Sequence, residues 1–270
     1  MSRGEKDQAE LLAMMERDAG DGIPEIGNRD AALALLPDLD FDAQLLAIRH
    51  LLRRNREADQ QLEREMQDLS AYAHRTGSEH AQDDWGELFQ ISVHQDAAHS
   101  MAAVGVLAPL LESIFYQAFQ KMPGHLESGA GRLASHPRGR LAAADLWDCH
   151  FFWKAGGRQK NIVEGVLQLS DAAGLKPHLP ADLRPTLDAL FAYRNKMFHC
   201  GFEWPDDERR AFEARIRDSN WPSDWFARAT RGGDPWIFYM SELFIEHSLT
   251  TIDQVIDGLG AFVRMERQKS

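Results

Sequence analysis

Apolar residues recur every three or four positions in one segment of this chain after another, and no segment alternates apolar with polar residues. The first pattern is that of one face of an α-helix, whereas sustained alternation would indicate a β-strand. The clearest example covers residues 96–121, with apolar positions Met101, Val104, Leu107, Leu111, Ile114, Phe115 and Ala118. The periodicity therefore predicts an all-α fold, a helical bundle without β-strands.

Helices are predicted over residues 6–17, 41–69, 96–121, 141–154, 161–172, 181–200, 206–217 and 235–267. Pro109 lies inside one of them, where its ring clashes with the preceding turn, so we expect a kink there. The polar segment around Gly77 is the expected boundary between two parts of the chain. We predict an N-terminal helical extension, residues 1–75, and a helical domain, residues 76–270.

The helix predicted over residues 181–200 carries the residues of chemical interest. Arg194 is followed directly by Asn195, and His199 stands after four intervening residues, shortly before the helix-ending residue Gly201. Arginine binds phosphate and histidine moves protons near neutral pH, so the pair fits metal-free cleavage of a phosphodiester. A structural interpretation remains open, in which the arginine pairs with a carboxylate at an interface and the histidine caps the helix.

The spacing by itself has little weight in a chain with 11 His and 30 Lys and Arg residues. The same spacing occurs at Arg75 and His80, with Thr, Gly, Ser and Glu between them, which is the composition of a turn. Arg194 and His199 differ from that pair because they lie on a predicted amphipathic helix, with Arg194 inside its apolar stripe.

An Arg-Asn pair followed at this distance by His, at the end of a helix in an all-helical chain, resembles the signature of the HEPN superfamily (higher eukaryotes and prokaryotes nucleotide-binding). The motif covers six residues, and the compatible helical pattern extends over residues 96–267. Members are helical bundles, many of them metal-independent ribonucleases, toxins or phage-defence effectors. The resemblance implies an HEPN-like endoribonuclease with an antiviral or toxin role.

The same resemblance assigns roles to three residues. The 2′-hydroxyl of RNA would attack the adjacent phosphate while His199 moves the proton. Arg194 would bind the scissile phosphate and stabilise the charge that develops on it. Asn195 would orient the histidine or the phosphate. Neither a cofactor nor a metal is implied.

Arg194 and His199 lie about 140° apart around a helix, because each residue turns it by about 100°. A single straight helix therefore cannot direct both side chains at one point. Two copies related by a two-fold axis can bring the Arg and His of both chains to one cleft, an arrangement that HEPN nucleases resemble. We therefore expect a homodimer.

Other residues are candidates for supporting roles. Glu112 flanks the apolar stripe of its predicted helix, and it or Asp148 would be the counter-ion of a half-buried Arg194, since an unpaired buried charge is costly. Residues 121–160 carry seven Lys or Arg against three Asp or Glu, whereas the chain has a net charge of −12. This segment favours a local basic cleft or a solvated basic loop. Candidate substrate-binding residues are Lys154, Arg158, Lys160 and Lys196.

Metal ligands are not expected. Cys149-His150 and His199-Cys200 are the combinations that suggest zinc, but adjacent residues of a helix point about 100° apart. The aromatic residues after the motif are expected to seal the end of the bundle rather than to stack on RNA bases: Phe202, Trp204, Trp221 and Trp225.

The first ten residues, MSRGEKDQAE, contain no apolar run, and the longest charge-free apolar run, near residues 101–111, is too short to span a membrane. We expect a cytoplasmic protein without membrane association, whose partners are RNA, a second copy and an antitoxin or sensor protein. The alternative is a non-catalytic HEPN-like module that binds a protein partner or a nucleotide. An Arg194 sealed in the core against a carboxylate would favour that alternative.

Overall fold

The computed structural model describes residues 27–124, 132–133 and 135–269. Within these ranges it contains seven α-helices and two separate two-stranded sheets, so the fold is mostly helical. The helix expected over residues 6–17 lies outside the described residues.

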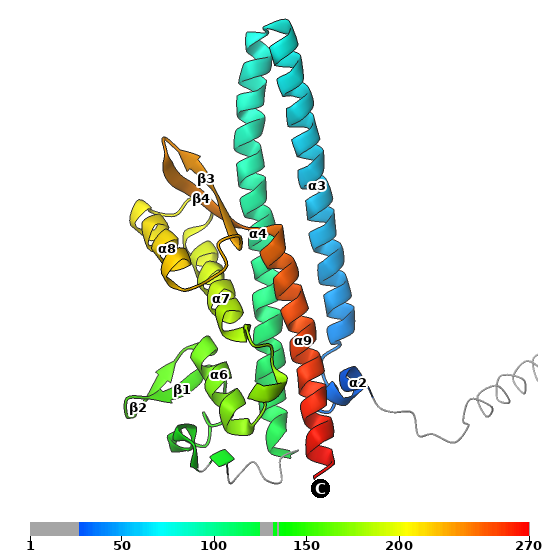
Figure 1. The fold of residues 1–270 in the computed structure, drawn as a ribbon, viewed down its shortest axis with the longest axis vertical. Helices are drawn as coiled ribbons and strands as arrows, with labels where there is room; N and C mark the ends of the chain where they lie inside the picture. The colour runs from blue at the N-terminus through cyan, green and yellow to red at the C-terminus, as the bar shows by residue number, and fades with distance from the viewer. Residues whose placement is uncertain (1–26, 125–131, 134, 270) are drawn as a thin grey trace, which may run out of the picture.

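Two long antiparallel helices, α3 (Phe41–Thr76) and α4 (Glu79–Lys121), form a hairpin that extends far beyond the rest of the molecule (Figure 1). The turn between them needs a left-handed residue, which Gly77 supplies with φ of 66°. The Ser78 side chain then caps α4. The helices predicted over residues 41–69 and 96–121 are confirmed, and both are longer than the apolar pattern indicated.

The expected domain boundary falls at the turn of this hairpin. On its N-terminal side, α2 (Asn28–Ala32) and the first half of α3 contribute Ala32 and Leu45 to one hydrophobic core with α4 and α9 (Glu242–Arg267). Gly260 lets α2 and α9 approach closely, because a Cβ at that position would lie 1.6 Å from the carbonyl oxygen of Asn28. The N-terminal helices are therefore packed into the main core.

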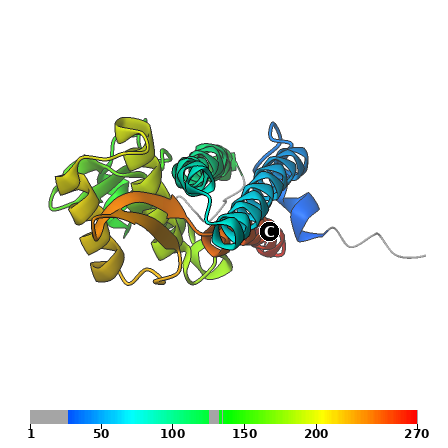
Figure 2. The same cartoon turned by 90° about the horizontal axis from the view of Figure 1, so that it is seen from above.

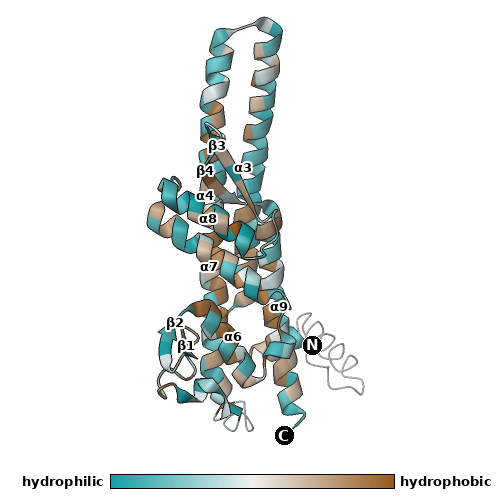
Figure 3. Cartoon of the chain, turned by 60° about the vertical axis from the view of Figure 1, so that its left-hand side comes forward, coloured by the Kyte–Doolittle hydropathy of each residue, from teal (hydrophilic) through white to brown (hydrophobic). Residues whose placement is uncertain are grey.

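The remaining helices gather on one side of α4 (Figure 2). They are α6 (Ile162–Ala173), α7 (Leu183–Cys200) and α8 (Asp206–Asp218), and each agrees with a predicted helix. Apolar residues concentrate where these helices and α9 meet α4, whereas the distal part of the hairpin is largely hydrophilic (Figure 3). The apolar face of α7 thus rests on the core, and its C-terminal end reaches the surface.

Two β-hairpins correct the prediction of a fold without strands. The first pairs β1 (Phe151–Lys154) with β2 (Gly157–Lys160), and the second pairs β3 (Phe226–Arg231) with β4 (Asp234–Met240). The predicted helix over residues 141–154 is therefore wrong, and the last helix begins at Glu242 rather than at 235.

Both hairpins have two-residue turns in which each residue adopts a positive φ. The angles are 53° and 79° at Ala155 and Gly156, and 63° and 93° at Gly232 and Gly233. Turns of this kind match the twist of paired strands, which is why they close short hairpins. The strands are only four to seven residues long, too short for alternation to be distinguished from helical spacing.

The segment Glu79–Gly124 is, by length and composition, apolar enough to cross a membrane, and it is the one such helix in the described part of the chain. More than half of its most apolar window is buried inside the protein. Leu107, Ile114 and Phe115 are fully buried in the core, as expected for the central helix of a bundle.

The tryptophans after the motif are buried, as predicted. Trp204 stacks on Phe238, and Trp225 stacks on Phe244. Trp221 also belongs to this aromatic cluster, which seals the end of the bundle next to α8.

Candidate functional site

A pocket of about 540 Å³ opens among α4, α6, α7, α8 and the β1–β2 hairpin. Its wall combines cationic, acidic and amide side chains that are far apart in the sequence: Glu112, His150, Lys160, Arg194, Asn195 and Arg215. Arg194 and Asn195 come from the predicted motif, Glu112 is a predicted supporting residue, and Lys160 is a predicted substrate-binding residue.

His150 lies between two carboxylates. Its Nε2 is 2.7 Å from Oε1 of Glu112 on α4, and its Nδ1 is 2.6 Å from Oδ1 of Asp148. Ionised carboxylates accept hydrogen bonds but cannot donate them, so this arrangement favours the imidazolium, in which both ring nitrogens donate. Glu112 and Asp148, expected as counter-ions of Arg194, instead bind this histidine.

The two carboxylates also favour the protonated form of the ring. Burial by itself lowers the pKa of His150, but the hydrogen bonds and charges of Glu112 and Asp148 outweigh it and raise the pKa above its usual value. The side chain is 27% exposed, so it is accessible from the pocket. The site therefore holds an accessible imidazole whose protonated form is stabilised.

Arg138 fixes the loop that carries Asp148 and His150. Its guanidinium is fully buried and donates to the main-chain carbonyls of Leu146, Asp148 and Phe151, each at 2.7 Å. Burial lowers the pKa of Arg138 to about 10, which leaves it charged at neutral pH. Because an arginine fork has donors in fixed directions, it holds three main-chain carbonyl groups of this loop at once.

Arg194 is half-buried and lines the pocket without a carboxylate partner among the described residues. Its Nη1 donates to Oδ1 of Asn195 at 3.2 Å, and its guanidinium carbon lies 5.8 Å from the centre of the Phe198 ring. Asn195 thus contacts the arginine. No carboxylate lies at ion-pair distance from Arg194 in the described part of the chain, so the expected counter-ion is not found there.

The pocket has more positive than negative charge although the chain is acidic. Its wall contains three Lys or Arg side chains against two carboxylates, before the imidazolium is counted. One of the carboxylates, Asp188, is already paired with Arg215 at 2.7 Å. Arg194 and Lys160 have no such pair in the described ranges, so their charges are available to an anion.

His199 does not line this pocket. It is exposed in the last turn of α7, and no described residue lies within hydrogen-bond distance of its ring. The separation of about 140° expected from the helical wheel explains why Arg194 faces the pocket and His199 faces solvent. Within one chain, the structure therefore brings Arg194 and Asn195 together but leaves His199 apart from them.

Lys196, the predicted substrate-binding residue on α7, already has a partner. Lys196 forms an ion pair with Glu208 of α8. Arg158 pairs with Asp145 at 2.7 Å and lies 3.6 Å from the centre of the Phe151 ring.

Lys154, the last of the predicted basic residues, is exposed at the end of β1. It lies outside the pocket wall, whereas Lys160 at the end of β2 is part of it.

The donor atoms of Asp148, Cys149 and His150 lie within 4.8 Å of one another. The expectation that adjacent residues diverge fails here, because this segment is a turn and not a helix. Cys149 is fully buried, and burial raises the pKa of its thiol to about 12.

His150 was not among the predicted site residues, because the predicted helix over residues 141–154 gave it no partner. A usable signal is present in the sequence. Three aromatic residues, 151–153, precede Lys154, Ala155 and a Gly-Gly pair, a pattern typical of a strand followed by a tight turn. That pattern would have placed His150 in a loop, but it would not have placed Glu112 beside it.

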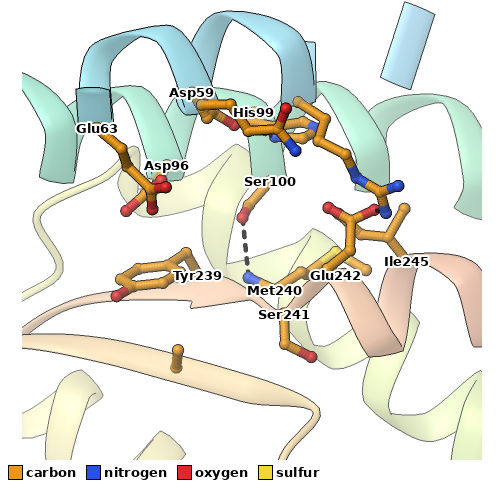
Figure 4. A pocket seen from close by; sticks show the side chains of 13 residues that line it. Asp59, Glu63, Asp96, His99, Ser100, Tyr239, Met240, Ser241, Glu242 and Ile245 are labelled. Atoms are coloured by element: carbon orange, nitrogen blue, oxygen red, sulfur yellow. Dashed lines mark hydrogen bonds and ion pairs between the residues drawn. The ribbon is translucent and has the colours of Figure 1, made fainter. Parts of the chain in front are cut away.

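A second pocket, of about 660 Å³, lies between the hairpin helices and the β4–α9 junction (Figure 4). Asp59, Glu63 and Asp96 point toward it from α3 and α4. His99 binds Asp59 through Nδ1 at 2.7 Å. With Glu242, the wall has four carboxylates against one arginine and one histidine, so it repels anions.

The pKa of Asp96 reflects both its burial and this accumulation of negative charge. Burial and the charges of Asp59 and Glu63 raise the pKa of Asp96 to about 6. The two pockets therefore differ in sign, and only the one lined by Arg194 suits a phosphate.

Comparison with known proteins gives no family: no family model matches the chain, and neither does any curated protein or solved structure.

Proposed function

We propose that this protein is a metal-independent endoribonuclease of the HEPN type. Arg194 binds the scissile phosphate, with Asn195 holding the guanidinium through the hydrogen bond between them. The 2′-hydroxyl of RNA attacks that phosphate, giving a 2′,3′-cyclic phosphate and a 5′-hydroxyl. The corresponding biological role, a toxin or phage-defence effector, is based on the resemblance of the motif alone.

The observation that carries the proposal is the unpaired guanidinium in a pocket of positive charge. Elsewhere in this acidic chain, arginines such as Arg184 and Arg215 are bound to carboxylates. Arg194 and Lys160 line one cavity without such partners among the described residues. An arginine left free in a cavity is suited to bidentate binding of a phosphate.

The proposal requires a second copy of the chain to supply or complete the proton-transfer group. His199 and Phe198 are both exposed at the end of α7, next to the pocket residue Asn195. A two-fold contact between two α7 ends covers the exposed Phe198 ring and brings His199 of each chain toward Arg194 of the other. The active species is therefore a homodimer.

A second candidate is a helical module that binds a nucleotide or a protein without cleaving it. The separation of His199 from Arg194 within one chain favours it, because the pocket can bind a phosphate without that histidine. An antitoxin or a sensor protein is the kind of partner that this candidate implies.

Incubation of the purified protein with total RNA in excess EDTA tests the proposal. We expect cleavage, with 2′,3′-cyclic phosphate and 5′-hydroxyl ends, and no cleavage of DNA, which lacks the 2′-hydroxyl. Products with 3′-hydroxyl and 5′-phosphate ends, formed only when magnesium is added, would show a metal-dependent nuclease instead. Intact RNA together with saturable binding of a nucleotide would favour the second candidate.

A further inference from the structure

We propose that His150, held between Glu112 and Asp148, is the general acid of the Arg194 pocket and protonates the departing 5′ oxygen. The inference rests on the proposed ribonuclease function. It adds a catalytic residue that lies outside the Arg-Asn-His motif and 44 positions before its arginine in the chain.

Cleavage of RNA by its own 2′-hydroxyl needs two proton transfers. The 2′ oxygen gives its proton to a base, His199, as it forms the bond to phosphorus. The bond between phosphorus and the 5′ oxygen breaks with its electron pair on that oxygen, which takes a proton from His150. Exchange with water returns both histidines to their starting forms.

His150 lies where a general acid for this pocket is needed. It is the histidine on the wall of the pocket that also holds Arg194, and it belongs to the same chain. Glu112 lines the pocket and Asp148 does not, so the Nε2 edge of the ring lies on the open side and the Nδ1 edge lies behind it. The Nε2 proton therefore lies on the substrate side, and its transfer replaces the hydrogen bond to Glu112 with one to the 5′ oxygen.

The surroundings of His150 also favour the protonated form of its ring. Glu112 and Asp148 both favour the imidazolium, which is the form that a general acid needs at neutral pH. The Tyr116 ring lies 5.7 Å from the imidazole, and the cations Arg194 and Lys160 line the same cavity. Asp188 is neutralised by Arg215, so the two carboxylates at His150 dominate its surroundings.

A contact between an imidazole and a carboxylate does not by itself make a phosphate-cleaving site, as His99 shows. It binds Asp59 at the same distance of 2.7 Å, but it borders the acidic pocket, where no phosphate is favoured. His99→Gln is therefore a matched control, since it removes a similar contact outside the proposed site.

A substrate with a modified leaving group tests the assignment directly. Two RNAs are compared, one normal and one in which sulfur replaces the bridging 5′ oxygen at the cleaved bond. A thiolate leaves without being protonated, so its departure does not need a general acid. We expect His150→Gln to slow cleavage of the normal RNA by about 10²- to 10⁴-fold and to cleave the sulfur-containing RNA at nearly the wild-type rate.

Two control variants separate the possible outcomes. His199→Gln should slow both RNAs, because a base is needed for either, and His99→Gln should slow neither. If His150→Gln slows cleavage of both RNAs equally, or does not slow cleavage of the normal RNA, His150 is not the general acid. The proposed ribonuclease function would stand in either case. A wild-type protein that cuts neither RNA would overturn the proposed function and this inference with it.

A second variant covers the case in which His150→Gln does not fold. Glu112→Gln keeps the shape of the side chain but removes one of the two charges that favour the imidazolium. The descending limb of the pH–rate profile on normal RNA should then move to lower pH, and the sulfur-containing RNA should show no such limb. An unchanged limb would contradict the role of His150.

Discussion

Nη2 of Arg138 donates a hydrogen bond to the main-chain carbonyl oxygen of Asp148 at 2.7 Å. The side chain of the same aspartate binds His150, so the buried guanidinium is one contact removed from the imidazole in the pocket. Removing a donor here leaves buried carbonyl groups unsatisfied, which costs more than the hydrogen bond itself contributes.

Arg138→Lys should therefore destabilise the protein by about 2–4 kcal/mol, because lysine cannot reach several carbonyls in fixed directions. Urea unfolding measures this difference. Arg140→Lys is the matched control, since Arg140 is exposed two residues away and should change stability by less than about 0.5 kcal/mol. Equal stability of both variants would mean that the loop does not depend on Arg138.

Arg194→Ala and His199→Ala should each reduce RNA cleavage by about 10²-fold or more while the circular dichroism spectrum and the melting temperature stay close to wild type. Both side chains are accessible, so their loss leaves no cavity in the core. Arg75→Ala and His80→Ala, the same spacing at the far end of the hairpin, should keep full activity. A folded His199→Ala protein with wild-type rates would remove His199 from the mechanism.

Mixing two inactive variants tests the shared site. If His199 of one chain acts with Arg194 of another, Arg194→Ala and His199→Ala subunits should regain part of the activity when they are mixed and allowed to exchange. Light scattering at the assay concentration should give the mass of a dimer. A monomer that cleaves RNA, or a mixture without recovered activity, would argue against a composite site.

Asp96→Asn should make the protein more stable at neutral and alkaline pH. The pKa of Asp96 is raised from an ordinary 3.8 to about 6, so the folded protein holds this proton more tightly than the unfolded chain. Wild type therefore loses stability as pH rises from about 4 to 6, and the loss is complete above that window. After allowance for screening by solvent, we expect a gain of about 1 kcal/mol at pH 8.

Thermal unfolding at several pH values measures this effect. The melting temperature of Asp96→Asn should exceed that of wild type by about 2–4 °C at pH 8, and the two should agree at pH 4. Asp84→Asn, an exposed position nearer the start of α4, is the control and should show no such dependence. A gain that persists at pH 4 would contradict the linkage to this carboxyl group.

Helical spacing was sufficient to predict α4, α6 and α7, because each buries one apolar face over several turns. It also predicted α3 and α8, although α8 buries only Phe212. It failed for the two hairpins, whose strands are too short for their period to be read and whose form depends on turns of positive φ. The prediction of a helix over residues 141–154 was wrong for that reason, and the expected surroundings of Asp148 were wrong as a consequence.

The sequence by itself determined the order Arg194, Asn195 and His199 on one helix, and the helical pitch already required that Arg194 and His199 point in different directions. Only the tertiary structure decided what lies beside the arginine. Glu112 and His150 are 38 residues apart, and they meet because α4 packs against the turn before β1. Contacts across such distances depend on how whole elements pack, and no local pattern of residue types records them.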